Sequence, residues 1–297
     1  ALKLGEAKDS RGKRLIQFFS VPRKPTKTNP KTRNMPEDAP DKWAEFIEYN
    51  RQDVVVEKAI RKRLLSLKPP DIEHEYWLLD QDINWRGVKV DMDLVDAALQ
   101  CNDEIVEKAT VSSARLTGLD NPNSTLQLKD WLSTRLGYEI ETMRKDDVSN
   151  LLSQDIPSDV RTVLKNRQVL GNSSIKKYLA MKNAVCSDGR IHGMLQFYGA
   201  MRSGRWAGRV VQLQNLPRNY LEDLDTARDV LKSRDVELLD LLYGNPGDVI
   251  KQLIRTALVA EKGHRFIVAD FSAIEARVIA WLAHEQWRQD VFAQGGD

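Results

Sequence analysis

An aspartate follows an apolar run near the C-terminal end of the sequence. Residues 265–269 read RFIVA, Asp270 comes next, and Glu275 lies five positions further on. The run predicts a buried strand, and a carboxylate at the end of such a strand is held rigidly enough to bind a divalent cation. A structural explanation is also open: Asp270 caps the helix expected from about Ile274, and Glu275 is a first-turn glutamate favoured by the helix dipole.

A second segment, residues 203–217, combines arginine, glycine and side-chain amides. It reads SGRWAGRVVQLQNLP. Arginines and amides contact phosphates and base edges, and small residues let the backbone approach a duplex closely. The alternative is an ordinary basic hairpin loop without a ligand.

Positive charge is concentrated in two parts of the chain, although the formal net charge is only +2. Residues 1–34 contain ten Lys or Arg and two acids, net +8, and residues 161–218 contain eleven Lys or Arg and one acid, net +10. A short charged run is usually a solvated face, but a run this long with one acid is better explained by a phosphate backbone as partner. We therefore expect the chain to bind nucleic acid.

The composition argues against several other classes of protein. The chain has 297 residues, 41% of them hydrophobic, which is enough for more than one domain. Its two cysteines cannot form a disulfide framework, and its four histidines lack the spacing of a zinc site. There is no apolar run of about 18 residues and no signal-peptide pattern at the start. These features predict a cytoplasmic protein.

Helices should position most of these residues. Residues 1–40 are basic and proline-rich and predict an irregular arm. Apolar periodicity and helix-end signals then predict a strand at about 88–90 and helices at about 43–64, 72–83, 91–117, 124–136 and 158–183, the last with a break near Gly171. Asp91 or Asp93, Ser124, Gly118 and Gly137 are the expected caps.

Strands become more frequent after about residue 185. Residues 191–198 and 210–213 have the pattern of strands, two helices are expected at about 222–243 and 248–260, and the buried strand 265–270 leads to the helix that begins near Ile274.

The order of the two segments resembles that of the family A DNA polymerases, those of the DNA polymerase I type. Residues 203–217 are similar to the family segment T-G-R-L-S-S-x-D-P-N-L-Q-N-I-P, which precedes the palm motif D-Y-S-Q-I-E-L-R, here at residues 270–277. The matching residues are Gly204, Arg205, Leu213, Gln214, Asn215, Pro217, Asp270, Ser272, Ile274, Glu275 and Arg277. Phe271 replaces Tyr, Ala273 replaces Gln, and residues 210–212 (VVQ) replace Asp-Pro-Asn.

The resemblance extends upstream. Residues 121–128 (NPNSTLQL) are similar to the N-x-x-S-x-x-Q-L of the family thumb, and residues 86–91 to the R-x-G-V-x-I-D that precedes it. Ser124 can both cap its helix and contact phosphate, because a helix N-terminus is itself an anion site. Tyr49 and Asp53 resemble the Y-x-x-x-D motif of the proofreading exonuclease, although this pattern alone is typical of many surface helices.

The resemblance implies an α+β multidomain fold, a helical thumb followed by the start of an antiparallel-sheet palm. Its parts would be a mostly helical C-terminal remnant of a 3′–5′ exonuclease-like domain (1–68), the thumb (69–184) and a partial palm (185–297). The D-x-E and N-x-x-x-D exonuclease motifs do not precede Tyr49, and the fingers and the His-Asp palm motif would lie beyond Asp297. The sequence also starts without Met, so we expect a fragment, and without those parts it should be inactive on its own. The abbreviated thumb and the spelling Y-N-R-Q-D at residues 49–53 favour a phage or prophage enzyme.

By resemblance, the activity is templated addition of deoxynucleotides to a primer 3′ end with two Mg²⁺ ions. Asp270 would hold both ions, the Phe271 carbonyl would complete one coordination shell, and Glu275 would crowd the sugar 2′ position. DNA contacts would come from Arg205, Gln214, Asn215, Asn121 and Ser124, with Ser272 and Arg277 supporting the motif. The expected partners are primer-template DNA and deoxynucleoside triphosphates, with the protein a monomer.

Two other functions fit the same residues. One is a DNA-binding module without catalysis, which needs only the positive charge. The other is a nuclease acting through Tyr49 and Asp53, where the Tyr would orient a water and the Asp would hold a metal. A nuclease with one metal carboxylate has an incomplete site, so we favour the polymerase.

Overall fold

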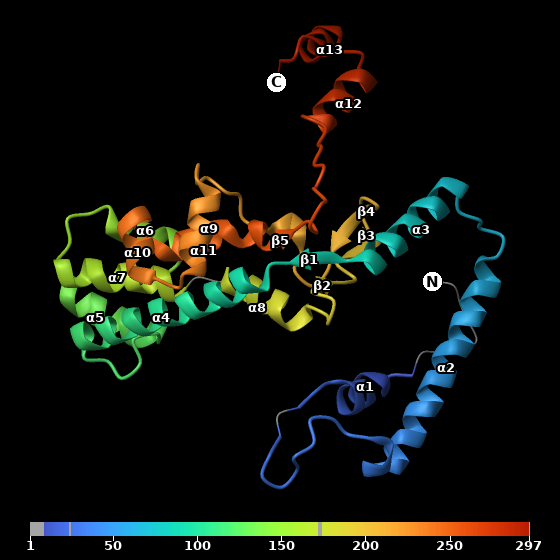
Figure 1. Cartoon of the computed structure of the whole chain (residues 1–297), viewed down its shortest axis with the longest axis horizontal. Coiled ribbons are helices and arrows are strands. Elements are labelled where there is room, and N and C mark those ends of the chain that lie inside the picture. Colours follow the sequence, from blue (N-terminus) through green and yellow to red (C-terminus); the bar gives the residue numbers. More distant parts are fainter. Residues whose placement is uncertain (1–8, 24, 172–173, 297) are drawn as a thin grey trace. The chain divides into compact units, whose positions relative to one another are not determined.

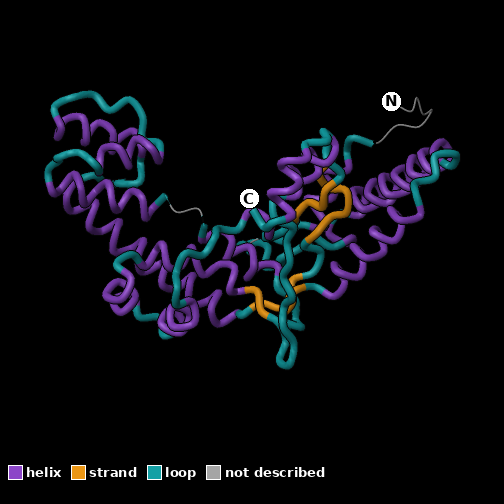
Figure 2. The backbone as a smooth tube through the Cα atoms, turned by 90° about the horizontal axis from the view of Figure 1, so that it is seen from above, coloured by secondary structure: helices purple, strands orange, loops and turns teal. Residues whose placement is uncertain are grey.

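The computed structural model describes residues 9–23, 25–171 and 174–296. The chain forms two compact units, Ala1–Tyr76 and Trp77–Asp297, and passes from one to the other within helix α3 (Asp71–Arg86). Helices predominate in both units, and the strands gather in two small antiparallel sheets (Figure 2). In the described ranges, no helix has both the length and the apolar character needed to span a membrane.

The first unit is built on the packing of α1 (Gly12–Ser20) against the long helix α2 (Pro40–Leu64) (Figure 1). A short 3₁₀ helix, η1 (Pro36–Asp38), precedes α2. The expectation of an irregular arm over residues 1–40 is wrong for α1. Its apolar residues recur at helical spacing, so that Phe19 is buried and stacks on Phe46 of α2 with the ring centroids 5.6 Å apart.

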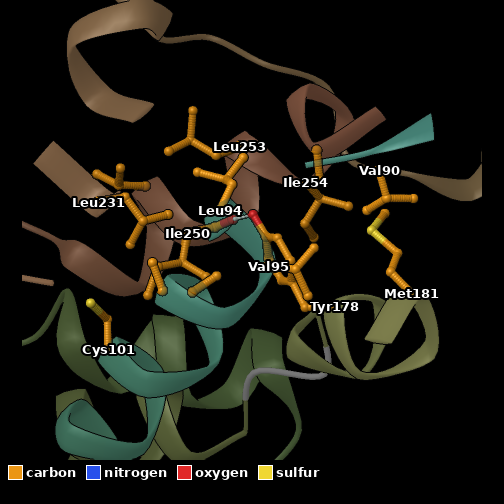
Figure 3. Close-up of a cluster of buried hydrophobic side chains, with 14 of the residues drawn as sticks. Val90, Leu94, Val95, Cys101, Tyr178, Met181, Leu231, Ile250, Leu253 and Ile254 are labelled. Atoms are coloured by element: carbon orange, nitrogen blue, oxygen red, sulfur yellow. Dashed lines mark hydrogen bonds between the residues drawn. The ribbon is translucent and has the colours of Figure 1, made fainter. Parts of the chain in front are cut away.

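The main core of the second unit surrounds α4 (Met92–Thr117), which is the longest helix described (Figure 3). It begins where the Asp91 carboxylate accepts a hydrogen bond from the Leu94 N–H (3.1 Å), and it ends at Gly118 in the left-handed conformation, as expected. Its buried face packs against α8 (Ile175–Ala184), α9 (Leu224–Lys232), α10 (Val236–Tyr243), α11 (Pro246–Gln252) and η3 (Leu253–Ala257).

A second, smaller core holds together α5 (Thr125–Leu136), α6 (Lys145–Leu152) and α7 (Ser158–Leu170). Ser124 caps α5 and Gly137 ends it, as predicted, because both signals are local in the sequence. Helix α6 was not predicted from the sequence. The break near Gly171 separates α7 from α8 as expected.

Two small antiparallel sheets lie in the second unit. The first has the order β2 (Arg190–Ile191), β1 (Val88–Val90), β5 (Leu258–Val259). The second is a hairpin of β3 (Leu195–Ala200) and β4 (Arg205–Gly208), in which Leu195 pairs with Gly208 and Ala200 with Arg205. The coarse expectation of helices with small antiparallel sheets is therefore confirmed.

Two predicted strands are not found. Residues 210–213 form a turn that leads into η2 (Leu213–Asn215), with Val210 and Gln212 at positive φ. Residues 265–270 are irregular, and Ile267 and Val268 are 86% and 89% exposed rather than buried. A strand needs a neighbour for its N–H and C=O groups, and none is described beside this segment. The helix predicted from Ile274 is present as α12 (Ile274–Leu282), followed by α13 (Gln286–Ala293).

Candidate nucleic-acid interface and palm-like site

The hairpin that carries Arg205 has an irregular, tightly packed turn. The register shifts between Gln196 and Ala200, Tyr198 has a φ of 52°, and Gly204 has a φ of 68°. The positive φ favours glycine at position 204, and a Cβ there would lie 2.9 Å from the Tyr198 ring, which would have to shift. The turn leaves the Arg205 side chain 70% exposed.

Gln214 and Asn215 lie on η2, directly after the hairpin. Gln214 packs so closely over Gly208 that a Cβ there would overlap with Oε1 of Gln214. Asn215 donates a hydrogen bond to Oε1 of Gln212 (3.2 Å). The segment after η2 is held by Arg255, which donates to the carbonyls of Pro217 and Leu216 at 2.7 Å each. The motif did not predict Arg255, because it lies 38 residues further along the chain.

Asp270 lies on the irregular segment just before α12 and is exposed, as is Phe271 (79%). The turn behind it is held by Arg277, whose Nε donates to the Ser272 carbonyl (2.8 Å) and whose guanidinium lies 4.5 Å from the Phe292 ring centroid. Ser272 and Arg277 therefore act together to fix the start of α12.

The structure brings the two sequence segments together through an ion pair between Arg205 and Glu275. Glu275 occupies the first turn of α12, where the helix dipole favours a carboxylate. Both side chains are about 70% exposed, so water and salt screen the pair and its contribution to stability is small.

The donors near Asp270 fit part of a magnesium site. Mg²⁺ is usually held by one or two carboxylates together with substrate phosphates and waters, and Asp270 with the Phe271 carbonyl offers one carboxylate and one neutral oxygen. Within the described residues there is no group of three or more His, Cys, Asp or Glu side chains that could enclose an ion. The described residues therefore fit a magnesium site to which this part of the chain supplies one carboxylate, that of Asp270.

Asn121 and Ser124 lie together at the N-terminus of α5, some distance along the chain from the hairpin. The Asn121 Oδ1 accepts from the Asn123 N–H (3.1 Å), and the Ser124 hydroxyl faces the Gln127 N–H (3.5 Å). Arg167 of α7 adds positive charge there by donating to the Thr125 hydroxyl (3.2 Å). A helix N-terminus beside an arginine is a favourable phosphate site.

Tyr49 and Asp53 lie one turn apart on α2, in the first unit. A hydrogen bond to Asp53 and partial burial raise the pKa of Tyr49, whose ring is covered by Gly12 of α1. An open cleft of about 510 Å³ beside Tyr49 is lined by Asp9, Ser10, Lys13, Ile16 and Gln17. The two predicted residues are thus in contact with one another.

The chain is similar to known polymerases in its fold and in its sequence. The solved POL domain of Pol1 from M. smegmatis, in complex with DNA primer-template and dNTP, matches with a TM-score of 0.50 and 20% identity over 81% of this chain and 39% of that chain. The fold is therefore similar to part of that polymerase domain. The family model for DNA polymerase family A matches residues 94–297, and the chain belongs to this family.

A DNA polymerase of Bacillus phage SP02 is 52% identical to the chain. The match covers all 297 residues here and 46% of the phage protein, so the chain spans about half the length of this relative.

Proposed function

We propose that this chain carries the thumb and the first part of the palm of a DNA-templated DNA polymerase. The observation that carries the proposal is the contact between Arg205 and Glu275, which joins the two segments that resemble polymerase motifs and places both beside the start of α12. Residues 69–184 would be the thumb and residues 185–297 the palm.

Primer-template DNA is the proposed partner. The net charge of +10 over residues 161–218 supplies attraction to phosphates, and Arg205, Gln214 and Asn215 add donors on one short stretch that can reach base edges. Asn121 and Ser124 would contact the backbone at the start of α5, where the helix dipole and Arg167 favour a phosphate.

At the palm, Asp270 and the Phe271 carbonyl would hold Mg²⁺, two ions of which are expected when the substrates are bound. The ions supply charge stabilisation at the transferred phosphoryl group and make the primer hydroxyl more acidic. Glu275 would release Arg205 to the DNA and lie against the sugar of the incoming deoxynucleoside triphosphate, where its carboxylate fills the space of a 2′-hydroxyl.

Residues 1–68 are proposed to be the C-terminal remnant of a 3′–5′ exonuclease-like domain. The support is the contact between Tyr49 and Asp53, which is the arrangement that the Y-x-x-x-D pattern requires. These two residues supply one metal carboxylate, so a nuclease is not the function we favour.

The test is extension of a labelled primer by the complete gene product, compared with its Asp270→Asn and Asp290→Asn variants. Asp290 is an exposed aspartate on α13 and serves as the control. We expect Asp270→Asn to slow extension about a hundredfold or more, because each 1.4 kcal/mol of lost charge stabilisation costs about tenfold, and to leave DNA binding intact. DNA binding without templated extension in the unsubstituted protein would instead indicate a non-catalytic DNA-binding module.

A further inference from the structure

A buried carboxylate lies on α3, outside every segment that resembles a polymerase motif. Asp80 is 4% exposed and accepts hydrogen bonds from the Trp206 indole N–H (2.9 Å), the Asn84 amide (3.1 Å) and the Gln81 amide (3.2 Å). All three donors are neutral groups. A buried polar group needs hydrogen-bond partners, so these contacts hold the side chains of Asp80 and its donors in place.

Asn84, one turn further along α3, attaches the same helix to the hairpin backbone. Its amide donates to the Leu195 carbonyl (2.9 Å) and accepts from the Leu195 N–H (2.9 Å). The Asn84 side chain thus pairs with both backbone groups of Leu195, the first residue of β3, as a neighbouring strand would. Together, Asp80 and Asn84 fasten both strands of the hairpin to α3, and Figure 1 shows the hairpin beside this part of the helix.

Trp206 directly follows Arg205 on β4. Successive side chains on a strand point to opposite faces, so holding Trp206 toward α3 directs Arg205 away from it. The Trp206 ring is also packed edge-on against Phe197 of β3, with centroids 5.3 Å apart. Trp206 is 36% exposed, whereas the Arg205 side chain is 70% exposed.

We propose that Asp80 is a positioning residue for Arg205, acting through Trp206. The DNA contact of Arg205 belongs to the proposed function, but the coupling of Asp80 to the hairpin does not depend on it. Asp80 and Trp206 lie 126 positions apart in the chain, and the carboxylate sets the orientation of the arginine by holding the neighbouring indole.

The direct test is hydrogen–deuterium exchange of the hairpin amides, residues 195–208, in Asp80→Asn and Trp206→Phe variants. Asp80→Asn turns one acceptor oxygen into a donor that faces other donors. Trp206→Phe removes the indole N–H together with one ring of the indole, and keeps an aromatic ring beside Phe197. Asp82→Asn, on the same helix but exposed and paired with Arg86, is the matched control.

We expect exchange across residues 195–208 to accelerate about tenfold in both variants and to be unchanged in the control, because loss of one anchoring hydrogen bond lowers the local opening free energy. If Asp80→Asn destabilises the whole unit, the exchange rates of Trp206→Phe decide whether the hairpin depends on this contact, since the effect of that substitution should be confined to the hairpin. Unchanged exchange in Trp206→Phe would overturn the proposal.

A second arm measures affinity for primer-template DNA in a double-mutant cycle with Arg205→Ala. Arg205→Ala should weaken binding about tenfold, Asp80→Asn should weaken it somewhat less, and the double variant should match Arg205→Ala alone. If the fold-losses in affinity of the two single variants multiply in the double variant, Asp80 does not act through Arg205. If the unsubstituted protein does not bind this DNA, the proposed function fails, whereas the exchange experiment still decides the coupling.

Discussion

Asp91 stabilises the second unit through three contacts at one carboxylate. It caps α4, and it forms ion pairs at 2.7 Å with both Arg228 and Lys232 of α9. Burial opposes its ionisation, but the hydrogen bonds from Lys232 and the Leu94 N–H outweigh that cost and lower the pKa of Asp91 below its usual value of 3.8. A depressed pKa means that the ionised form stabilises the fold above about pH 4 and that this stability is lost as the pH falls through the folded-state pKa.

We predict that Asp91→Asn lowers the free energy of unfolding at pH 7 by about 2–4 kcal/mol, because it leaves two partly buried cations without their partner. Urea unfolding at pH 7 and pH 3 measures this, and the difference from the unsubstituted protein should shrink at the lower pH. Asp93→Asn is the control, since Asp93 pairs with Arg234 at a more exposed position and should cost under about 1 kcal/mol. Equal losses in the two variants would show that burial at Asp91 is unimportant.

Single residues differ in how far the sequence could predict them. Asp270, Glu275 and Arg205 lie in two segments whose order along the chain resembles that of the family A polymerase motifs, and this order made them candidate site residues. In the structure, Arg205 forms an ion pair with Glu275. Asp80 gave no signal, because an acid within the helical pattern of residues 72–83 looks like a solvated position. Its role depends on a contact 126 positions away, which no local pattern contains.

At the scale of elements, the β3–β4 hairpin depends on glycine at its turn. We predict that Gly204→Ala costs about 1–3 kcal/mol, from left-handed strain and from displacement of the half-exposed Tyr198 ring. Gly118→Ala is a matched control, because Gly118 has nearly the same φ (70°) but no atom within 4 Å of the added Cβ. Its cost should be about 1–2 kcal/mol, from strain alone.

Thermal unfolding of the two variants measures the difference. A larger drop in Tm for Gly204→Ala is expected. If both variants unfold at the same temperature, the close approach of Tyr198 does not constrain the turn.

Helices were predictable from the sequence where the residues that cap their ends lie within the helix or directly beside it. The helix limits at Asp91, Gly118, Ser124 and Gly137 follow from caps within a few residues, and the structure has them. The strand at 265–270 was predicted from its apolar run, but a strand exists only beside another strand, and the run says nothing about a partner. The helix predicted at 222–243 is divided because Asp235 caps a new helix by accepting from the Leu238 N–H (2.9 Å).

At the scale of the whole molecule, family membership and charge distribution both support the proposed partner, primer-template DNA. The family model matches residues 94–297, and this range contains the basic stretch 161–218, the hairpin and the start of α12. The division into two compact units, in contrast, could be anticipated only approximately, because the chain passes between them inside a continuous helix.

The proposed function requires that this chain binds primer-template DNA through its basic stretch and contacts the primer end through Arg205. The measurement is the affinity for a primer-template duplex, matched or mismatched at the primer end, by fluorescence anisotropy from 50 to 200 mM salt. We predict that a plot of the logarithm of the binding constant against the logarithm of the salt concentration has a slope of about −4 or steeper, and that the matched primer end binds more tightly. In Arg205→Ala, the preference for the matched end should be lost while the slope is nearly unchanged. A slope near zero, or equal binding of both primer ends by the unsubstituted protein, would contradict the account.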